Sequence, residues 1–183
     1  CIRDRLDGDV SRLVQFTRTM GYLASPPDSG DQLIDVSTLL EEFLGGYAST
    51  ADDAPRFLYR GEAGTRVRSD KVLLLQAFDA LLSVARSCAR GGEVVRAVTR
   101  RRNGAGQGGD VEVEITFPAG PLTELELDEI QVPYGLRRIL PEIGPNALAA
   151  ARGIFRGQGG GLDLTEPRVG QLRWIAALPA AGE

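Results

Sequence analysis

The first 25 residues carry apolar side chains at spacings of three and four, which places them on one stripe of a helix over residues 3–24. A single helix cannot bury such a stripe, so we expect it to pack against another helix, from a second copy or from a further part of this chain. Docking on its own domain is the alternative. The residues expected at a dimerisation surface are Leu6, Val10, Leu13, Val14, Thr17 and Met20.

The pattern breaks at residues 25–32 (SPPDSGDQ), where two prolines, aspartates and a glycine predict the end of the helix and a linker. We therefore expect three parts. Residues 1–25 are one helix, residues 26–34 are the linker, and residues 35–183 are one folded domain.

Helix and strand patterns are mixed along residues 35–183. Helices are expected at residues 35–44, 70–90 and 146–156. Asp35 or Ser37 is placed to cap the first, and Asp70 lies near the dipole-positive start of the second. Alternating segments predict strands at residues 56–60, 65–69, 93–100, 110–117, 161–165 and 171–179. The predicted fold class is α/β (α+β): a two-layer sandwich with a mixed, mostly antiparallel sheet and helices on one face.

The glycine-rich residues 103–109 lie between two of these strands and predict a hairpin turn. They do not predict a phosphate-binding loop, because no helix opens directly after them. Residues 122–141 predict short helical or irregular pieces, interrupted by Pro133 and closed by Pro141. The single tryptophan, Trp174, is expected in the core.

Composition narrows the function classes. Hydrophobic residues make up 43% and charged residues 25% of the chain, as in soluble globular proteins. The net charge is −4, and the arginines near residues 96–102 are interpreted as a solvated strand end, so nucleic acid is not expected as a partner. No membrane span is expected in this segment. Cys1 and Cys88 lack disulfide or metal spacing, which favours the cytoplasm.

Histidine is absent from the chain. This absence excludes histidine-based catalytic dyads and triads, zinc sites of the HExxH type and imidazole general bases. No catalytic residue and no metal ligand is predicted.

Several segments in the correct order resemble the ATP-binding domain of sensor histidine kinases, of the GHKL type that is also found in gyrase. Residues 66–85 (RVRSDKVLLLQAFDALLSVA) resemble its strand and asparagine-box helix, and residues 130–134 (IQVPY) resemble its Ile-Phe-x-Pro-Phe element. Residues 148–160 resemble its lid-side helix with a His-Gly-Gly-like turn, and residues 174–179 its closing strand. Residues 12–16 (RLVQF) resemble the second helix of the dimerisation hairpin. The resemblance implies that residues 1–25 are the C-terminal helix of that helical hairpin.

The resemblance covers nearly the whole chain, and it implies ATP with Mg²⁺ as cofactors, a homodimer formed by the N-terminal helix, and a response regulator or partner histidine kinase as the binding partner. The departures fall on the residues that carry the chemistry. Ala80 and Val84 replace the two asparagines of the asparagine box, of which the second holds Mg²⁺ in the family. Neither side chain has the oxygen that a hard cation requires.

Further departures affect the base and the phosphates. Pro118 stands where the family has the aspartate that accepts from adenine, although Gly120 is kept. Loss of such a hydrogen bond commonly removes several kcal/mol of discrimination. The second glycine box survives only around Gly144 and Asn146, and Asn146 is interpreted first as a helix N-cap. Binding of ATP and Mg²⁺ is therefore expected to be weak or absent.

Three hypotheses remain open. The first is a divergent or pseudokinase module that dimerises and contacts a kinase or a response regulator. The second is an active but atypical kinase that phosphorylates a histidine upstream of Cys1, and the third is a histidine-phosphotransferase-like scaffold. A rebuilt nucleotide site would use the candidate residues Asp79, Ser83, Ser87, Arg86, Gly120, Gly144 and Asn146.

Overall fold

The computed structural model describes residues 30–47, 54–102, 109–118 and 147–182. Several predictions lie outside these ranges. They are the N-terminal helix with its six dimerisation residues, the pieces at 122–141, and the candidate residues Gly120, Gly144 and Asn146.

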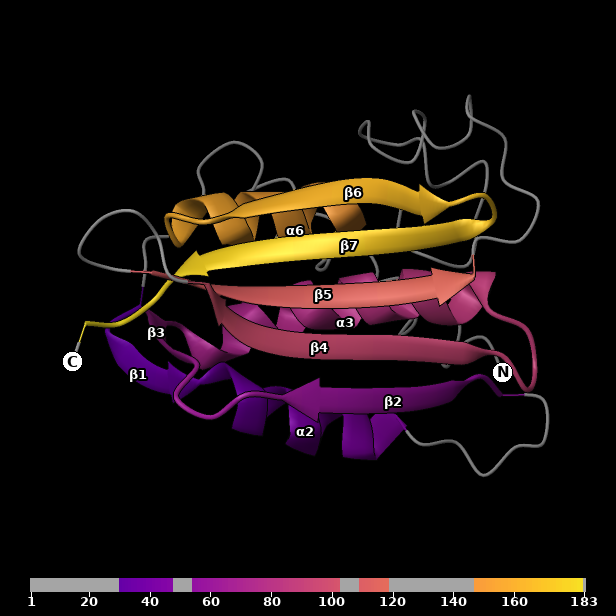
Figure 1. Cartoon of the computed structure of the whole chain (residues 1–183). Coiled ribbons are helices and arrows are strands. Elements are labelled where there is room, and N and C mark those ends of the chain that lie inside the picture. Colours follow the sequence, from indigo (N-terminus) through magenta and orange to yellow (C-terminus); the bar gives the residue numbers. More distant parts are fainter. Residues whose placement is uncertain (1–29, 48–53, 103–108, 119–146, 183) are drawn as a thin grey trace, which may run out of the picture.

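The larger sheet has five strands in the order β2-β4-β5-β7-β6 (Figure 1). The strands are β2 (Arg56–Gly61), β4 (Val94–Arg102), β5 (Asp110–Pro118), β6 (Gly161–Arg168) and β7 (Gln171–Pro179). β2 and β4 are parallel, and all other neighbours in this sheet are antiparallel. The predicted strands at 93–100 and 110–117 pair antiparallel as β4 and β5. Nearly all of the turn predicted at residues 103–109 lies outside the described residues. A mixed, mostly antiparallel sheet is thus confirmed.

Alternation along the strands separates the two faces of this sheet. On β5, Val111, Val113, Ile115 and Phe117 are completely buried. Charged and polar residues at the even positions of the same strand face the opposite side. One face is therefore apolar and must be covered.

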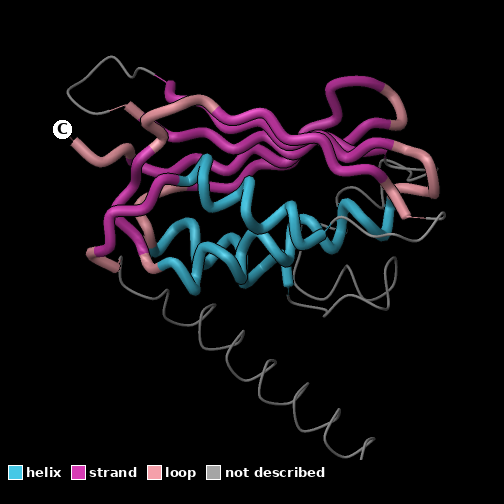
Figure 2. The backbone as a smooth tube through the Cα atoms, turned by 90° about the horizontal axis from the view of Figure 1, so that it is seen from below, coloured by secondary structure: helices cyan, strands magenta, loops and turns pink. Residues whose placement is uncertain are grey.

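Three helices provide that cover, all on the same face of the sheet (Figure 2). They are α2 (Val36–Tyr47), α3 (Lys71–Cys88) and α6 (Ala147–Gly157). Asp70 caps α3, because its carboxylate accepts from the backbone N–H groups of Val72 at 2.8 Å and Leu73 at 3.1 Å. Asp35 does the same for α2, accepting from Ser37 at 3.0 Å and Thr38 at 3.2 Å. The predicted two-layer sandwich is confirmed.

A second, two-stranded sheet joins β1 (Gln32–Asp35) to β3 (Arg66–Ser69) in antiparallel register. The strand β1 was not predicted, because it is four residues long, lies mostly within the residues 26–34 that were interpreted as a linker, and leaves Leu33 54% exposed. The strands predicted at 56–60 and 65–69 are both present, but they belong to different sheets.

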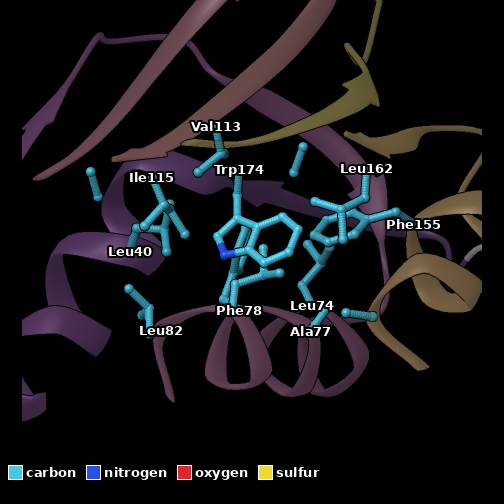
Figure 3. Packing of buried hydrophobic residues seen from close by; sticks show 14 of the residues in the cluster. Leu40, Leu74, Ala77, Phe78, Leu82, Val113, Ile115, Phe155, Leu162 and Trp174 are labelled. Carbon is cyan, nitrogen blue, oxygen red and sulfur yellow. The ribbon is translucent and has the colours of Figure 1, made fainter. Parts of the chain in front are cut away.

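The core lies between α3 and the five-stranded sheet (Figure 3). Trp174 is 1% exposed, as predicted, and its ring stacks on Phe117 with centroids 6.3 Å apart. Phe78 on α3 and Phe155 on α6 meet edge to face at 5.7 Å. Complete burial of such side chains stabilises a fold by roughly 1.5–3 kcal/mol each. This packing fixes α3 and α6 against the sheet.

Candidate functional site

The candidate nucleotide-binding residues that the structure describes all lie on α3. Asp79, Arg86 and Ser87 are exposed and Ser83 is half-buried. Their spacings of three and four place them along one side of the helix, away from its buried side. The structure therefore brings these four residues onto one surface.

The buried side of α3 carries Val84 and Ala80, the two positions that the family resemblance aligns with the asparagine box. Val84 is completely buried and belongs to the apolar core, and Ala80 is half-buried and packs against that core. Both side chains are hydrocarbon, so neither offers a lone pair to a cation. Ser83 and Val84 are consecutive in a helix, so their side chains point about 100° apart around its axis.

The C-terminal end of β5 is also apolar at the position that the family resemblance aligns with an adenine-binding aspartate. Phe117 is completely buried and pairs in register with Leu172 of β7, which is 1% exposed. Pro118, the residue at the position of that aspartate, pairs with Gln171 and has no side-chain hydrogen-bonding group. The apolar core thus extends to the end of this strand.

The glycine-rich turn after α6 is held close to the sheet. A Cβ on Gly160 would lie 2.0 Å from the carbonyl oxygen of Ala177, so only glycine fits there. Gly159 has a φ of +77°, a conformation that favours glycine. The tight turn brings the end of α6 against β7.

A buried hydrogen bond links the turn after α6 to the residue that precedes the N-cap of α3. Ser69 Oγ donates to Gln158 Oε1 at 2.8 Å, and the two residues are 0% and 4% exposed. Ser69 directly precedes Asp70, the N-cap of α3. Sequence analysis missed this pair, because 89 residues separate its members and neither residue type is specific for such a contact.

Gly30, the first described residue, also packs against the junction between β3 and α3. A Cβ on Gly30 would lie 2.6 Å from the backbone nitrogen of Asp70, so the backbone packs directly on the β3–α3 junction. Gln32 pairs with Ser69 in the two-stranded sheet. Thus β1, the start of α3 and the end of α6 meet at one buried contact.

Two arginine pKa values depart from the ordinary value. The pKa of Arg100 is raised, chiefly because its guanidinium donates to the carboxylate of Glu112. The pKa of Arg152 on α6 is lowered, first by burial and then by repulsion from Arg156. Arg100 lies on β4 and Arg152 on α6, so neither residue is part of α3.

Within the described ranges, no group of three or more cysteines, aspartates or glutamates is placed to hold a metal ion. None of the helices in those ranges has the length and apolarity needed to cross a lipid bilayer.

No protein-family model matches the chain, and no curated protein matches it either. Solved structures, however, do match the chain. The Acinetobacter baumannii histidine kinase AdeS superposes with a TM-score of 0.69 and 16% identity, over 98% of this chain and 84% of that chain.

Two nucleotide-free structures of the catalytic domain of histidine kinase ThkA also match. Their TM-scores are 0.65 and 0.63, with 14% and 16% identity, and they cover 81% and 83% of this chain and 97% and 98% of theirs. The element order, the mixed sheet and the helical layer agree with these structures, so this chain has the fold of histidine kinase catalytic domains.

Proposed function

We propose that this chain is a histidine-kinase-like module of a bacterial, cytoplasmic two-component system, and that its ATP site has lost the groups that hold Mg²⁺ and adenine. The module dimerises through the helix of residues 3–24. It acts by contacting a kinase or a response regulator rather than by transferring phosphate. The shared fold supports the signalling role, and the chemistry of α3 supports the loss of catalysis.

Val84 is the observation that carries the proposal. In the histidine kinase pattern the residue at this position is the asparagine that ligates Mg²⁺, and here it is a completely buried valine in the core. Mg²⁺ requires oxygen ligands in near-octahedral geometry and dehydrates reluctantly. A hydrocarbon side chain leaves the metal one protein ligand short, and the triphosphate then lacks its metal bridge.

Asp79 and Ser83 do not replace this ligand in the arrangement seen here. Asp79 is exposed, and the side chain of Ser83 points about 100° away from that of Val84 around the helix axis. For either oxygen to take the place of the asparagine, α3 would have to rotate and expose its buried stripe. The tight packing of Phe78 against Phe155 opposes such a rotation.

Isothermal calorimetry of the whole chain with ATP and Mg²⁺ tests the proposal. We expect no saturable heat up to about 1 mM nucleotide, corresponding to a binding free energy weaker than about −4 kcal/mol. Titration of ATP with EDTA provides the metal-free control. Low-micromolar binding that disappears with EDTA would exclude the proposal and support the active kinase instead.

A further inference from the structure

The face of the large sheet that is turned toward the reader in Figure 1 is not covered by α2, α3 or α6. It presents alternate residues of each strand, among them arginines from β2, β4 and β7 and glutamates from β5. The strand register decides which arginine meets a glutamate. Arg100 lies opposite Glu112, whereas Arg96 lies opposite Thr116.

Three arginines on this face form ion pairs with glutamates of β5. Arg100 Nε donates to Glu112 Oε1 at 2.9 Å, and Arg102 approaches the other oxygen of Glu112 at 3.4 Å. Arg173 on β7 lies 3.5 Å from Glu114. Glu112 is 4% exposed, so its two arginines stabilise a carboxylate that is shielded from water. This half of the face has its charges satisfied.

Arg60 and Arg96 differ from these three. The parallel pairing of β2 with β4 places Leu58 beside Arg96 and Val98 beside Arg60. Within the described part of the chain, neither arginine has an ion-pair partner. We call Leu58, Arg60, Arg96 and Val98 the β2–β4 patch. It combines two exposed cations with two apolar side chains in a checkerboard.

The β2–β4 patch borders an open depression of about 480 Å³. Leu58 is 50% exposed there and supplies apolar surface beside the two arginines. Glu62 lies at the rim, where its carboxylate accepts from the backbone N–H of Arg101 at 3.1 Å. Two arginines against one glutamate leave the depression with a positive excess.

We propose that the β2–β4 patch binds an acidic, extended segment of a partner protein in which carboxylates alternate with apolar side chains. The inference deepens the proposed function and rests on it, since it names the face that contacts the partner. Carboxylates pair with Arg60 and Arg96 through charge-assisted hydrogen bonds. Apolar side chains of the same segment cover Leu58 and Val98 and remove them from water.

The chemistry of the β2–β4 patch favours a peptide over nucleic acid. Tyr59, the aromatic residue at the depression, packs against the core, and its hydroxyl donates to the carbonyl oxygen of Ser37 at 3.0 Å. Its ring is therefore not free for the base stacking that single strands use. A peptide needs only the guanidinium groups and the apolar side chains.

Fluorescence anisotropy with labelled peptides on the whole chain tests this inference. The probe is a short peptide of alternating Glu and Leu, compared with one of alternating Lys and Leu and with oligothymidylate. The test variant is Arg60→Glu with Arg96→Glu. Its matched control is Arg156→Glu with Arg168→Glu, a double charge reversal at exposed arginines of α6 and β6. Because all four side chains are exposed, the folds should survive, which far-UV circular dichroism checks.

We expect the Glu-Leu peptide to bind the wild type and the control variant equally, and the Arg60→Glu, Arg96→Glu variant at least about tenfold more weakly, since attraction becomes repulsion. The neutral variant Arg60→Gln, Arg96→Gln should fall between them. Equal binding to all variants, no binding to the wild type, or oligothymidylate binding through these same arginines would overturn the inference. Calorimetry with ATP and Mg²⁺ reports separately on the proposed function, so failure of one is distinguishable from failure of the other.

Discussion

At the scale of single residues, Val84 determines the chemistry available on the buried side of α3. Its two methyl groups belong to the core, and no water reaches them. An asparagine there would need hydrogen-bond partners for its amide, which an apolar core does not provide. The same position cannot serve both the core seen here and a metal site.

The substitution Val84→Asn separates these two roles. We expect it to lower the free energy of unfolding by about 1–3 kcal/mol, because it buries an amide without partners. Val72→Asn is the matched control, since Val72 lies on the same helix and is 62% exposed. The control should change stability by no more than about 0.5 kcal/mol. Urea unfolding measures both, and equal stabilities would show that position 84 faces a polar site.

Which residues were predictable depends on how local their interactions are. Asp35 was one of two predicted caps of α2 and Asp70 was predicted near the start of α3, because a side chain at a helix start interacts with amides two and three residues ahead. The core position of Trp174 was predicted from its hydrophobicity. The bond between Ser69 and Gln158 was not predictable, because it depends on how two distant elements pack.

At the scale of elements, that bond connects the strand before α3 to the turn after α6. Both of its atoms are shielded from water, so each needs the other. The junction also contacts Gly30 and β1, which precede the whole domain in sequence. A substitution at this junction would therefore affect the packing of α3, α6 and β1 together.

A double-mutant cycle at this junction tests the coupling. Ser69→Ala should lower the free energy of unfolding by about 1–3 kcal/mol, because it leaves the buried Gln158 oxygen without this donor. Adding Gln158→Leu should cost less than the sum of the two single changes. Thr165→Ala, at an exposed position on β6, is the control. Strict additivity in urea unfolding would contradict the coupling.

Elements with clear periodicity and the local pairing of β4 with β5 were predicted, whereas the pairing of strands distant in sequence was not. The three described helices and six of the seven described strands lie close to the expected ranges, since burial imposes a period of 3.6 or 2 on them. The strand β1 was missed, because four residues with an exposed leucine give too little pattern. The parallel pairing of β2 with β4 was also missed, because nothing in either segment specifies its partner.

At the scale of the whole molecule, motif order predicted the fold although no family model recognises the chain. The superpositions with histidine kinase structures confirm the architecture at 14–16% identity. A fold of this kind survives as long as the buried face of each element stays apolar. Exposed positions are free to change because they contribute little to that burial, whereas Val84 is itself part of the buried face.

Chemical unfolding of the whole chain with and without MgATP tests the central claim most directly. A ligand at about 100 times its dissociation constant stabilises the folded state by about 2.7 kcal/mol. At about 1 mM MgATP, a histidine kinase site with a dissociation constant near 10 μM would produce that increase. We predict no change in the urea midpoint, because α3 presents Val84 to the core instead of an oxygen to Mg²⁺. An increase of that size, abolished by EDTA, would contradict the account.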